Sequence, residues 1–473
     1  EKLILSYSDT NAKGEGISPA YLIGSIRSLY PKLKIENSYC YPENPEAGID
    51  LFLEKLVQET EKEHEDILEQ ADETDAVFGE LYSWYLRNPE YRSRVQKLVQ
   101  SAFAGKPEDI ISQSVAKALY GEVSPYSATR LERFAACAFA HFLQYGMKLT
   151  ERVEYEFKPM DMGNVMHEAL ESFAEEVRKR GMKWTELTEQ ERNEIADRCL
   201  DNIVADYGNT VLKSSARNEY MIERTRRILR RTVWALQKQL EQGEFQPEGF
   251  EVTFGGGRID RVDIMEDQNK VYVKVIDYKT GNTSFDLVYL YHGLQLQLMI
   301  YLDGALRVEQ KKYPDKEIIP AGVFYYNIKD PMIQEKIDAD VEAVSAGLMK
   351  ELKMNGLVQA DPELVYRMDS SLGSIPVAFN KDGSFRKNSS VADRTQFAVL
   401  GRYVRTKIEK IRSSILEGDA EVSPYELGKK NACTYCPYMT VCGFDRRLSG
   451  YEFRRLKNFS DEELWKAFDR EAE

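Results

Sequence analysis

The chain has 473 residues, a formal net charge of −14, 42% hydrophobic residues and 30% charged residues. This composition is typical of a globular protein of about three domains and excludes a disordered chain. The acidic balance argues against a protein that is basic over its whole surface, but it is compatible with a local basic groove. The sequence lacks an apolar run of about 18 residues and a signal peptide, so we expect a cytoplasmic protein with no membrane partner. It does not begin with Met, which suggests a piece of a longer protein.

The N-terminal part of the chain, residues 1–123, is predicted to be mainly helical after a short apolar strand at 3–7. A helix is expected after Ser18-Pro19, because this pair is a typical helix start. A charged helical pattern then extends over residues 50–118. No G-x4-G-K-S/T pattern occurs in the chain, so we expect no ATP site in it.

The pattern changes near residue 124, and apolar periodicity then predicts alternating helices and strands. Helices are expected at 127–145, from 163 onward, at 188–206, 217–243, 288–304, 338–353 and 391–416. Strands are expected at 250–254, 258–265, 270–278 and 322–326. This mixture predicts an α/β domain over residues 124–430, followed by a cysteine-containing tail at 431–473.

The strand that ends at Lys279 carries an unusual pair of charges. Three valines, Asp277 and Lys279 point to the same face, because side chains alternate along a strand. Charged groups on a core face are costly unless they pair or take part in chemistry. Taken alone, this short pattern favours an ordinary ion pair at a strand end.

The preceding strand adds two carboxylates, Asp260 and Asp263, which are three residues apart and therefore face opposite sides. A tight turn between the strands would place Asp260 beside Asp277. Two converging carboxylates form a hard oxygen site suited to Mg²⁺ or Mn²⁺. Such a metal lowers the pKa of a bound water, and Lys279 could stabilise the transition state of phosphodiester cleavage.

Three further side chains are candidates for the same site. Gln297 and Tyr301 are four residues apart on a predicted helix and share a face, from which both could hydrogen-bond a phosphate or a water. His167 lies near a helix start in Gly163–His167, although a lone histidine is more often structural.

These patterns resemble, in type and order, the motifs of RecB-like nucleases of the PD-(D/E)XK superfamily. The four motifs are G-x-x-x-H at 163–167, G-x-x-D-R-x-D at 257–263, D-Y-K at 277–279 and Q-x-x-x-Y at 297–301. The resemblance implies a nuclease core with a mixed central sheet flanked by helices. It implies that the metal is bound by His167, Asp260, Asp277 and the backbone carbonyl of Tyr278. It further implies catalytic roles for Asp260, Asp277, Lys279, Gln297 and Tyr301.

The cysteines suggest a second site. Cys433, Cys436 and Cys442 form C-x2-C-x5-C, and Cys137, in an aromatic helix ahead of the nuclease motifs, is the candidate fourth ligand. Spacing alone leaves zinc, an iron–sulfur cluster and free thiols open.

This arrangement of one early and three late cysteines resembles the four-cysteine [4Fe–4S] site of AddB-type subunits of AddAB helicase–nucleases. The resemblance implies a structural cluster that joins the two ends of the nuclease domain. The loop between Cys137 and Cys433 is long, and closing it in the unfolded chain costs about 5 kcal/mol. Ala138 stands where the family often has proline. The resemblance also implies that residues 1–123 are a remnant of a helicase-like region and that an AddA-type subunit supplies the ATP-driven motor.

The resemblance implies DNA as substrate, and two predicted helices offer basic side chains for it. The candidates for DNA binding are Arg224, Arg227, Arg231, Arg405 and Arg412. Solvated helix faces are an equally simple interpretation of these residues, and a phosphate-binding wall is the functional one.

Three functions remain as hypotheses. The first is a Mg²⁺-dependent exonuclease domain that acts in the processing of double-strand breaks, by family on the 5′-ended strand. The second is a stand-alone iron–sulfur exonuclease, against which the long N-terminal part argues. The third is a non-catalytic DNA-docking or scaffold module with a zinc or iron–sulfur site, against which the intact set of Asp260, Asp277 and Lys279 argues.

Overall fold

The computed structural model of the chain contains two compact units, Glu1–Gly105 and Lys106–Glu473. The structure describes residues 5, 7, 18–33, 48–49, 52–53, 56, 73–102, 110–121, 127–150, 159–206, 215–255, 257–333, 340–447 and 450–472. The strand predicted at 3–7 falls mostly outside the described residues. In the second unit, α5 (Gln113–Tyr120) packs against α15 (Arg394–Glu417).

The first unit is helical where it is described, as the sequence predicted. Its helices are α1 (Tyr21–Leu29), α3 (Glu73–Arg87) and α4 (Pro89–Ala102). Helices α3 and α4 pack around a small aromatic core in which Phe52 stacks on Phe78, with ring centroids 4.9 Å apart. Tyr85 and Val95 complete this core.

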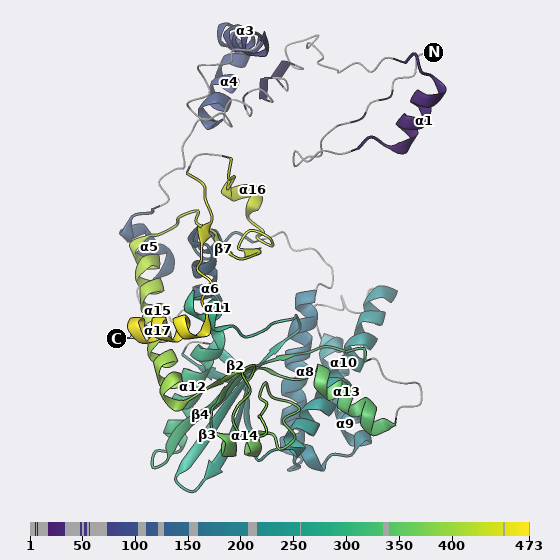
Figure 1. Cartoon of the computed structure of the whole chain (residues 1–473), viewed down its shortest axis with the longest axis vertical. Helices are drawn as coiled ribbons and strands as arrows, with labels where there is room; N and C mark the ends of the chain where they lie inside the picture. The colour runs from purple at the N-terminus through teal and green to yellow at the C-terminus, as the bar shows by residue number, and fades with distance from the viewer. Residues whose placement is uncertain are drawn as a thin grey trace. The chain divides into compact units, whose positions relative to one another are not determined.

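A six-stranded mixed sheet forms the centre of the second unit (Figure 1). Its strands, in spatial order, are β1 (Gln246–Phe254), β2 (Gly257–Asp267), β3 (Lys270–Lys279), β4 (Glu317–Asn327), β5 (Asn355–Gln359) and β6 (Val391–Ala392). The strand pairs β3–β4 and β5–β6 are parallel and the others are antiparallel. The helix α12 (Gln297–Lys312) makes the crossover from β3 to β4.

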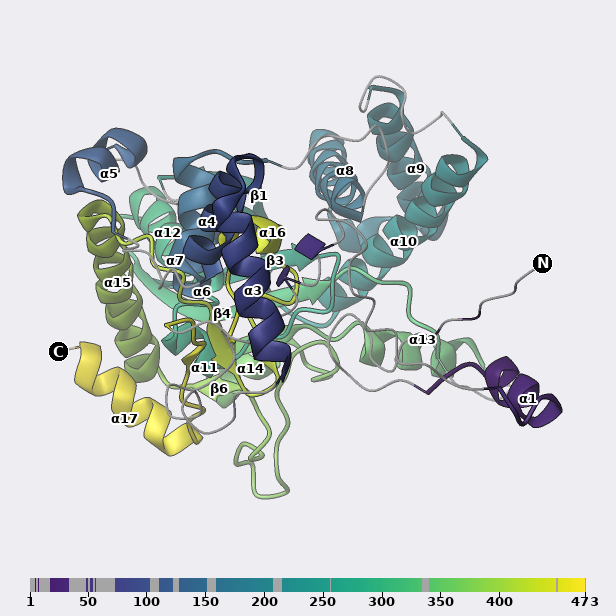
Figure 2. The same cartoon turned by 90° about the horizontal axis from the view of Figure 1, so that it is seen from above.

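Helices cover both faces of this sheet, which lies between them in two perpendicular views (Figures 1 and 2). One face packs against α8 (Pro159–Lys179), α9 (Glu189–Asp206) and α10 (Ala216–Glu241). The other packs against α12 and α15, and α6 (Ala128–Ala136) and α17 (Asp461–Ala472) pack on these helices in the same core. Strand β3 is buried on both sides: Ile276 belongs to the core on the α8 side and Val273 to the core on the α12 side, as expected for a strand between two helical layers. The predicted α/β class, a mixed central sheet flanked by helices, is confirmed.

Shorter elements complete the second unit. They are α7 (Ala138–His141), a π-helix (Phe142–Gly146), a 3₁₀-helix (Trp184–Glu186), α11 (Leu287–Tyr291), α13 (Val341–Glu351), α14 (Pro362–Met368) and α16 (Met439–Cys442). A separate small sheet contains β7 (Tyr425–Leu427), β8 (Lys430–Asn431) and β9 (Arg454–Arg455).

Three of the differences between the predicted and the observed helices have a clear local cause. The helix expected at 127–145 breaks at Cys137, whose backbone is extended with φ −165° and ψ 118°. The helix expected at 288–304 is two helices, because Gly293 adopts φ 79° after α11. The helix expected from residue 391 begins at Arg394, after Asp393 caps it.

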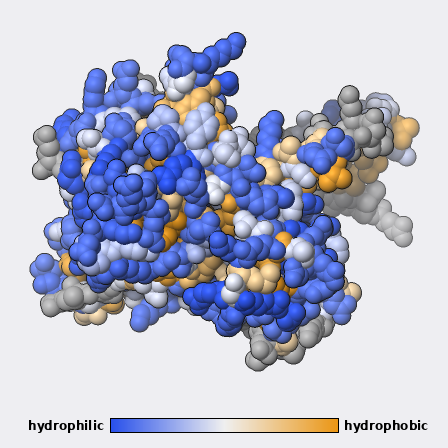
Figure 3. Space-filling model, turned by 90° about the horizontal axis from the view of Figure 1, so that it is seen from below, coloured by the Kyte–Doolittle hydropathy of each residue, from blue (hydrophilic) through white to orange (hydrophobic). Residues whose placement is uncertain are grey.

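The surface drawn in Figure 3 is largely hydrophilic, and its hydrophobic residues form small separate patches. No helix in the described part of the chain is both long and apolar enough to cross a membrane.

Candidate active site

The hairpin of β2 and β3 brings two carboxylates together where the strands begin to separate. Arg261 pairs with Ile276 at the last position of the ladder, so the next residues along are Asp260 and Asp277. The backbone N–H of Tyr278 donates to Oδ2 of Asp260 at 2.7 Å. Both carboxylates belong to buried residues. The structure therefore places Asp260 beside Asp277, as the strand alternation predicted.

Asp263 has a different environment. It is fully buried on the opposite face of β2, where Arg261 donates to both carboxylate oxygens at 2.5 and 2.9 Å and Lys274 lies 2.8 Å away. Burial raises the pKa of this carboxyl group, but the two cations outweigh burial and hold the pKa below its ordinary value. Asp263 is thus part of a buried ion-pair network and not of the site.

Lys279 connects Asp277 to the helix α12. Its ammonium lies 2.5 Å from Oδ2 of Asp277 and donates to Oε1 of Gln297 at 2.8 Å. The amide of Gln297 in turn donates to the hydroxyl of Tyr301 at 2.9 Å. Four predicted site residues therefore form one continuous chain of polar contacts.

The environment of Asp277 disfavours its ionised form. Burial, and then the nearby charge of Asp260, raises the pKa of Asp277 from 3.8 to about 7, against the opposing effect of Lys279. A carboxylate pair of this kind is stabilised by a cation placed between the oxygens.

His167, on α8, faces the same carboxylates. Its Nδ1 lies 3.4 Å from Oδ2 of Asp260 and 3.7 Å from Oε1 of Glu251. Burial lowers the pKa of His167, but these two carboxylates outweigh burial and raise it to about 10. The imidazole thus lies in a strongly negative environment.

Glu251 is a site residue that the sequence interpretation missed. Ligand atoms of His167, Glu251 and Asp260 all lie within 4.8 Å of one another, close enough to bind one cation. Glu251 lies opposite Asp260, because the flanking pairs of the β1–β2 ladder are 250 with 261 and 252 with 259. Its φ of 50° is unusual for a residue other than glycine and often marks functional sites. The glycine-rich turn at 255–257 was the signal that could have revealed this pairing.

Glu132, on α6, is a second residue that was missed. Its Oε1 accepts hydrogen bonds from the backbone N–H groups of Leu296 and Gln297 at 2.7 and 2.9 Å, and so caps the start of α12. The residue is partly exposed, but its carboxyl group is enclosed by protein, and burial raises the pKa to about 7 against the effect of these hydrogen bonds. Only the tertiary structure brings this side chain to Gln297.

The four cysteines predicted as ligands line one cavity. These are Cys137, Cys433, Cys436 and Cys442. Cys137 occupies the break between α6 and α7, and the guanidinium of Arg133 lies 3.9 Å from Sγ of Cys436. Burial, and then the other three thiols, raises the pKa of Cys433 to about 12.

The spacing of these sulfur atoms is wider than a closed zinc site requires. Among the described residues, no three of these sulfur atoms lie within 4.8 Å of one another. A tetrahedral zinc site with ligand bonds of about 2.3 Å needs sulfur atoms about 3.8 Å apart. The cysteines share a cavity without forming that arrangement.

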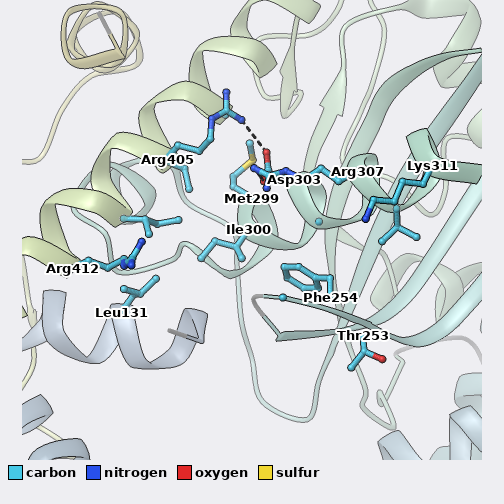
Figure 4. A pocket seen from close by; sticks show the side chains of 16 residues that line it. Leu131, Thr253, Phe254, Met299, Ile300, Asp303, Arg307, Lys311, Arg405 and Arg412 are labelled. Atoms are coloured by element: carbon cyan, nitrogen blue, oxygen red, sulfur yellow. Dashed lines mark hydrogen bonds and ion pairs between the residues drawn. The ribbon is translucent and has the colours of Figure 1, made fainter. Parts of the chain in front are cut away.

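The predicted DNA-binding arginines fall into two separate groups. Arg405 and Arg412, on α15, line a cavity of about 670 Å³ between α15 and α12 (Figure 4). The other three are on α10, in the helical layer across the sheet. There Arg227 pairs with Asp330 at 2.6 Å, and Arg231 lies over the ring of Trp234.

Comparison with known proteins places this site in a family context. The model of the PD-(D/E)XK nuclease superfamily matches residues 125–443. A protein from Lachnoclostridium phytofermentans, named as the B subunit of an ATP-dependent helicase/deoxyribonuclease, is 39% identical over 497 aligned residues, covering 100% of this chain and 42% of its own length. Proteins of the same name from Clostridium acetobutylicum and Thermoanaerobacter sp. are each 31% identical and are covered over 43% of their length. The predicted resemblance to AddB-type subunits is confirmed, and the chain spans less than half the length of these relatives.

Proposed function

Because the chain belongs to the PD-(D/E)XK nuclease superfamily, we propose that it is the DNA exonuclease domain of an AddB-type helicase–nuclease subunit. The reaction is hydrolysis of phosphodiester bonds, by family on the strand that ends 5′. The observation that carries this proposal is the convergence of Asp260, Asp277 and Lys279 on adjacent strands. Asp260 accepts from the N–H of Tyr278, and Lys279 contacts both Asp277 and Gln297. A decayed nuclease would have no reason to keep these costly buried charges in register.

The donor set fits a divalent cation such as Mg²⁺ or Mn²⁺. His167, Asp260 and Asp277 would hold it, together with the carbonyl of Tyr278. That carbonyl points to the β2 side of the strand because the N–H of the same residue does. Among the described residues, the ligand atoms that lie within 4.8 Å of one another are those of His167, Glu251 and Asp260, so Glu251 would be an additional oxygen ligand and Asp277 would bind from outside this close group. When bound, the cation supplies Lewis-acid activation of a water and neutralises charge on the phosphate.

The protein's own side chains have distinct roles in this chemistry. Lys279 offers a positive charge to the phosphate oxygens as negative charge develops in the transition state. Gln297 orients Lys279 by accepting its hydrogen bond, and Tyr301 holds the amide of Gln297 in place. Asp277 supplies the carboxylate that keeps the ammonium at the strand end.

We propose that the four cysteines bind a structural [4Fe–4S] cluster. The shared cavity and the family resemblance support this assignment, and sulfur atoms set wider than a zinc site are compatible with a cluster in which each thiolate binds a different iron. Such a cluster would fasten the C-terminal tail to the break after α6. A visible spectrum of anaerobically purified protein tests it: a featureless spectrum with one zinc per chain would overturn it.

The biological setting follows from the relatives. They are named as the B subunit of an ATP-dependent helicase/deoxyribonuclease, and we infer that this chain acts with an AddA-type partner that holds the motor. The substrate would be a single strand produced from a linear duplex end, in cytoplasmic repair of double-strand breaks by recombination. The alternative, a non-catalytic DNA-docking or scaffold module with a zinc or iron–sulfur site, would preserve DNA binding without hydrolysis.

The deciding experiment measures degradation of end-labelled linear DNA with Mg²⁺, with EDTA, and with EDTA followed by excess Mg²⁺. We expect activity that EDTA abolishes and Mg²⁺ restores. Asp277→Ala should lose it, while Asp469→Ala, a control at an exposed carboxylate on α17, should keep it. Full activity of Asp277→Ala would refute the site, and binding without hydrolysis by the unmodified chain would favour the alternative.

A further inference from the structure

A groove of about 670 Å³ lies between α12, α15 and the tip of the β1–β2 hairpin. Figure 4 shows its lining side chains, which come from these elements and from α6. Its floor is apolar and includes Leu131, Phe254, Met299, Ile300, Val404 and Ile408. The volume falls within the range of about 300–1,000 Å³ that is typical of ligand sites.

Two rows of cations border this floor. Arg307 and Lys311 are four residues apart on α12, and Arg405 and Arg412 are seven apart on α15, so each pair shares a helix face. Among the lining residues that the structure describes, Asp303 is the one anion, and it contacts both Arg307 and Arg405. The groove is thus basic in a chain whose net charge is −14.

Two of these cations have unused binding capacity. Lys311 is exposed and has no ion-pair partner in the described part of the chain. The Nε of Arg412 is buried and lacks a hydrogen-bond acceptor among the described groups. A buried donor without a partner usually finds its acceptor in a ligand or in water.

The groove adjoins the candidate active site through Phe254. The ring of Phe254 packs edge-on against Tyr301, with centroids 5.9 Å apart, and Tyr301 belongs to the chain of contacts that reaches Lys279. Gly304 makes this packing possible, because a Cβ there would lie 2.6 Å from the Phe254 ring. A ligand in the groove would therefore contact Phe254 on the side opposite to Tyr301.

We propose that this groove binds a single strand of DNA beside the active site, with bases on the apolar floor and phosphates on the two basic rows. The inference rests on the proposed nuclease function and adds a path for its substrate. Single-strand sites combine a stacking surface with a basic groove that follows the backbone, and Phe254 with the aliphatic floor and the four cations provides both. An acidic peptide would use the cations but would leave the apolar floor without a matching partner.

The test measures the binding of a fluorescein-labelled oligothymidylate by anisotropy in the Asp277→Ala background, where cleavage cannot interfere. The variants are Arg405→Gln with Lys311→Gln, each alone and together. Arg402→Gln is the matched control, because Arg402 is an exposed arginine on the same helix outside the groove. We expect the double variant to weaken binding roughly five-fold or more, and each lost phosphate contact to lower the slope of log K against log salt by about 0.7.

A second measurement does not depend on substitutions. Ultraviolet cross-linking of an oligonucleotide that contains 5-iododeoxyuridine should label peptides around Phe254 or Met299. Cross-links confined to other regions, together with Arg405→Gln and Lys311→Gln variants that bind like Arg402→Gln, would overturn the proposal. Binding of a polyglutamate peptide, but not of oligothymidylate, would also overturn it.

Failure of the groove can be distinguished from failure of the proposed function. If the unmodified chain hydrolyses DNA with Mg²⁺ and the groove variants keep the same KM, the nuclease stands and the groove is wrong. If the chain binds the oligonucleotide in the groove but never hydrolyses it, the groove is a DNA-binding site and the proposed nuclease function is wrong.

Discussion

The buried carboxyl group of Glu132 makes a pH-dependent prediction about stability. Its pKa is raised from 4.5 to about 7 in the folded protein, mainly by burial. Between these values the folded state binds a proton more tightly than the unfolded state does, so the contribution of this group to stability falls as pH rises. Above pH 7 the folded protein holds an ionised carboxylate in a site that disfavours the charge. We therefore expect Glu132→Gln to be more stable than the unmodified protein at high pH.

The expected gain in stability of Glu132→Gln follows from the raised pKa of Glu132. A change of about 2.5 pKa units corresponds to about 3 kcal/mol, which is an upper limit because the residue is partly exposed. The glutamine keeps an oxygen that can accept from the N–H groups of Leu296 and Gln297, so the helix cap is retained. At about 2 °C per kcal/mol for a large domain, the variant should melt up to about 6 °C above the unmodified protein.

The assay is a thermal scan at pH 5 and at pH 8.5. We expect the melting temperatures to differ little at pH 5, where the carboxyl group is protonated in the folded protein, and to separate by several degrees at pH 8.5. Glu462→Gln, at an exposed position in the first turn of α17, is the control and should show no such change. A difference in melting temperature that is the same at both pH values would refute the assignment of a buried, protonatable carboxyl group.

Three further predictions separate the roles of neighbouring groups. Asp263→Asn should destabilise the protein by about 3–5 kcal/mol in urea unfolding, because it breaks a buried ion-pair network. Asp260→Asn, in contrast, should fold and lose DNA hydrolysis. Loss of hydrolysis without loss of stability in Asp263→Asn would contradict these separate roles of the two carboxylates. Lys279→Ala should reduce kcat by at least about 100-fold with little change in KM, as expected for a group that acts on the transition state, and an unchanged kcat would exclude that role. Cys137→Ser should abolish visible absorption by the purified chain and increase its proteolysis, and an unaltered spectrum would remove Cys137 as a ligand.

The strands of the site could be predicted because their signals are local. Alternation along 271–279 placed Asp277 and Lys279 on one face, and the turn residues before Lys270 predicted the hairpin that brings Asp260 to Asp277. The same alternation separated Asp263 from the pair, and the structure buries it on the other side of the sheet. Periods of two and 3.6 residues are properties of the backbone, so they can be recognised in one sequence.

The missed features depend on tertiary contacts or on very short elements. Glu132 reaches Gln297 across 165 positions of sequence, and no pattern within one helix reveals such a contact. Strands β6, β8 and β9 have two residues each, too few for any periodicity. The break at Cys137 was hidden because the residues on both sides of it have ordinary helical composition.

The helix α6 joins the two candidate centres of this chain. Its Glu132 caps α12, where Gln297 contacts Lys279, and its last residue is followed by Cys137 in the cysteine cavity. Arg454, from the C-terminal tail, also donates to the carbonyl of Ala135 near the end of this helix. A group that fixes the four cysteines would therefore hold α6 in place and, through Glu132, the start of α12. Since Lys279 donates to Gln297, a structural role for the cysteine site would be sufficient to make the proposed hydrolysis depend on it, without any transfer of electrons.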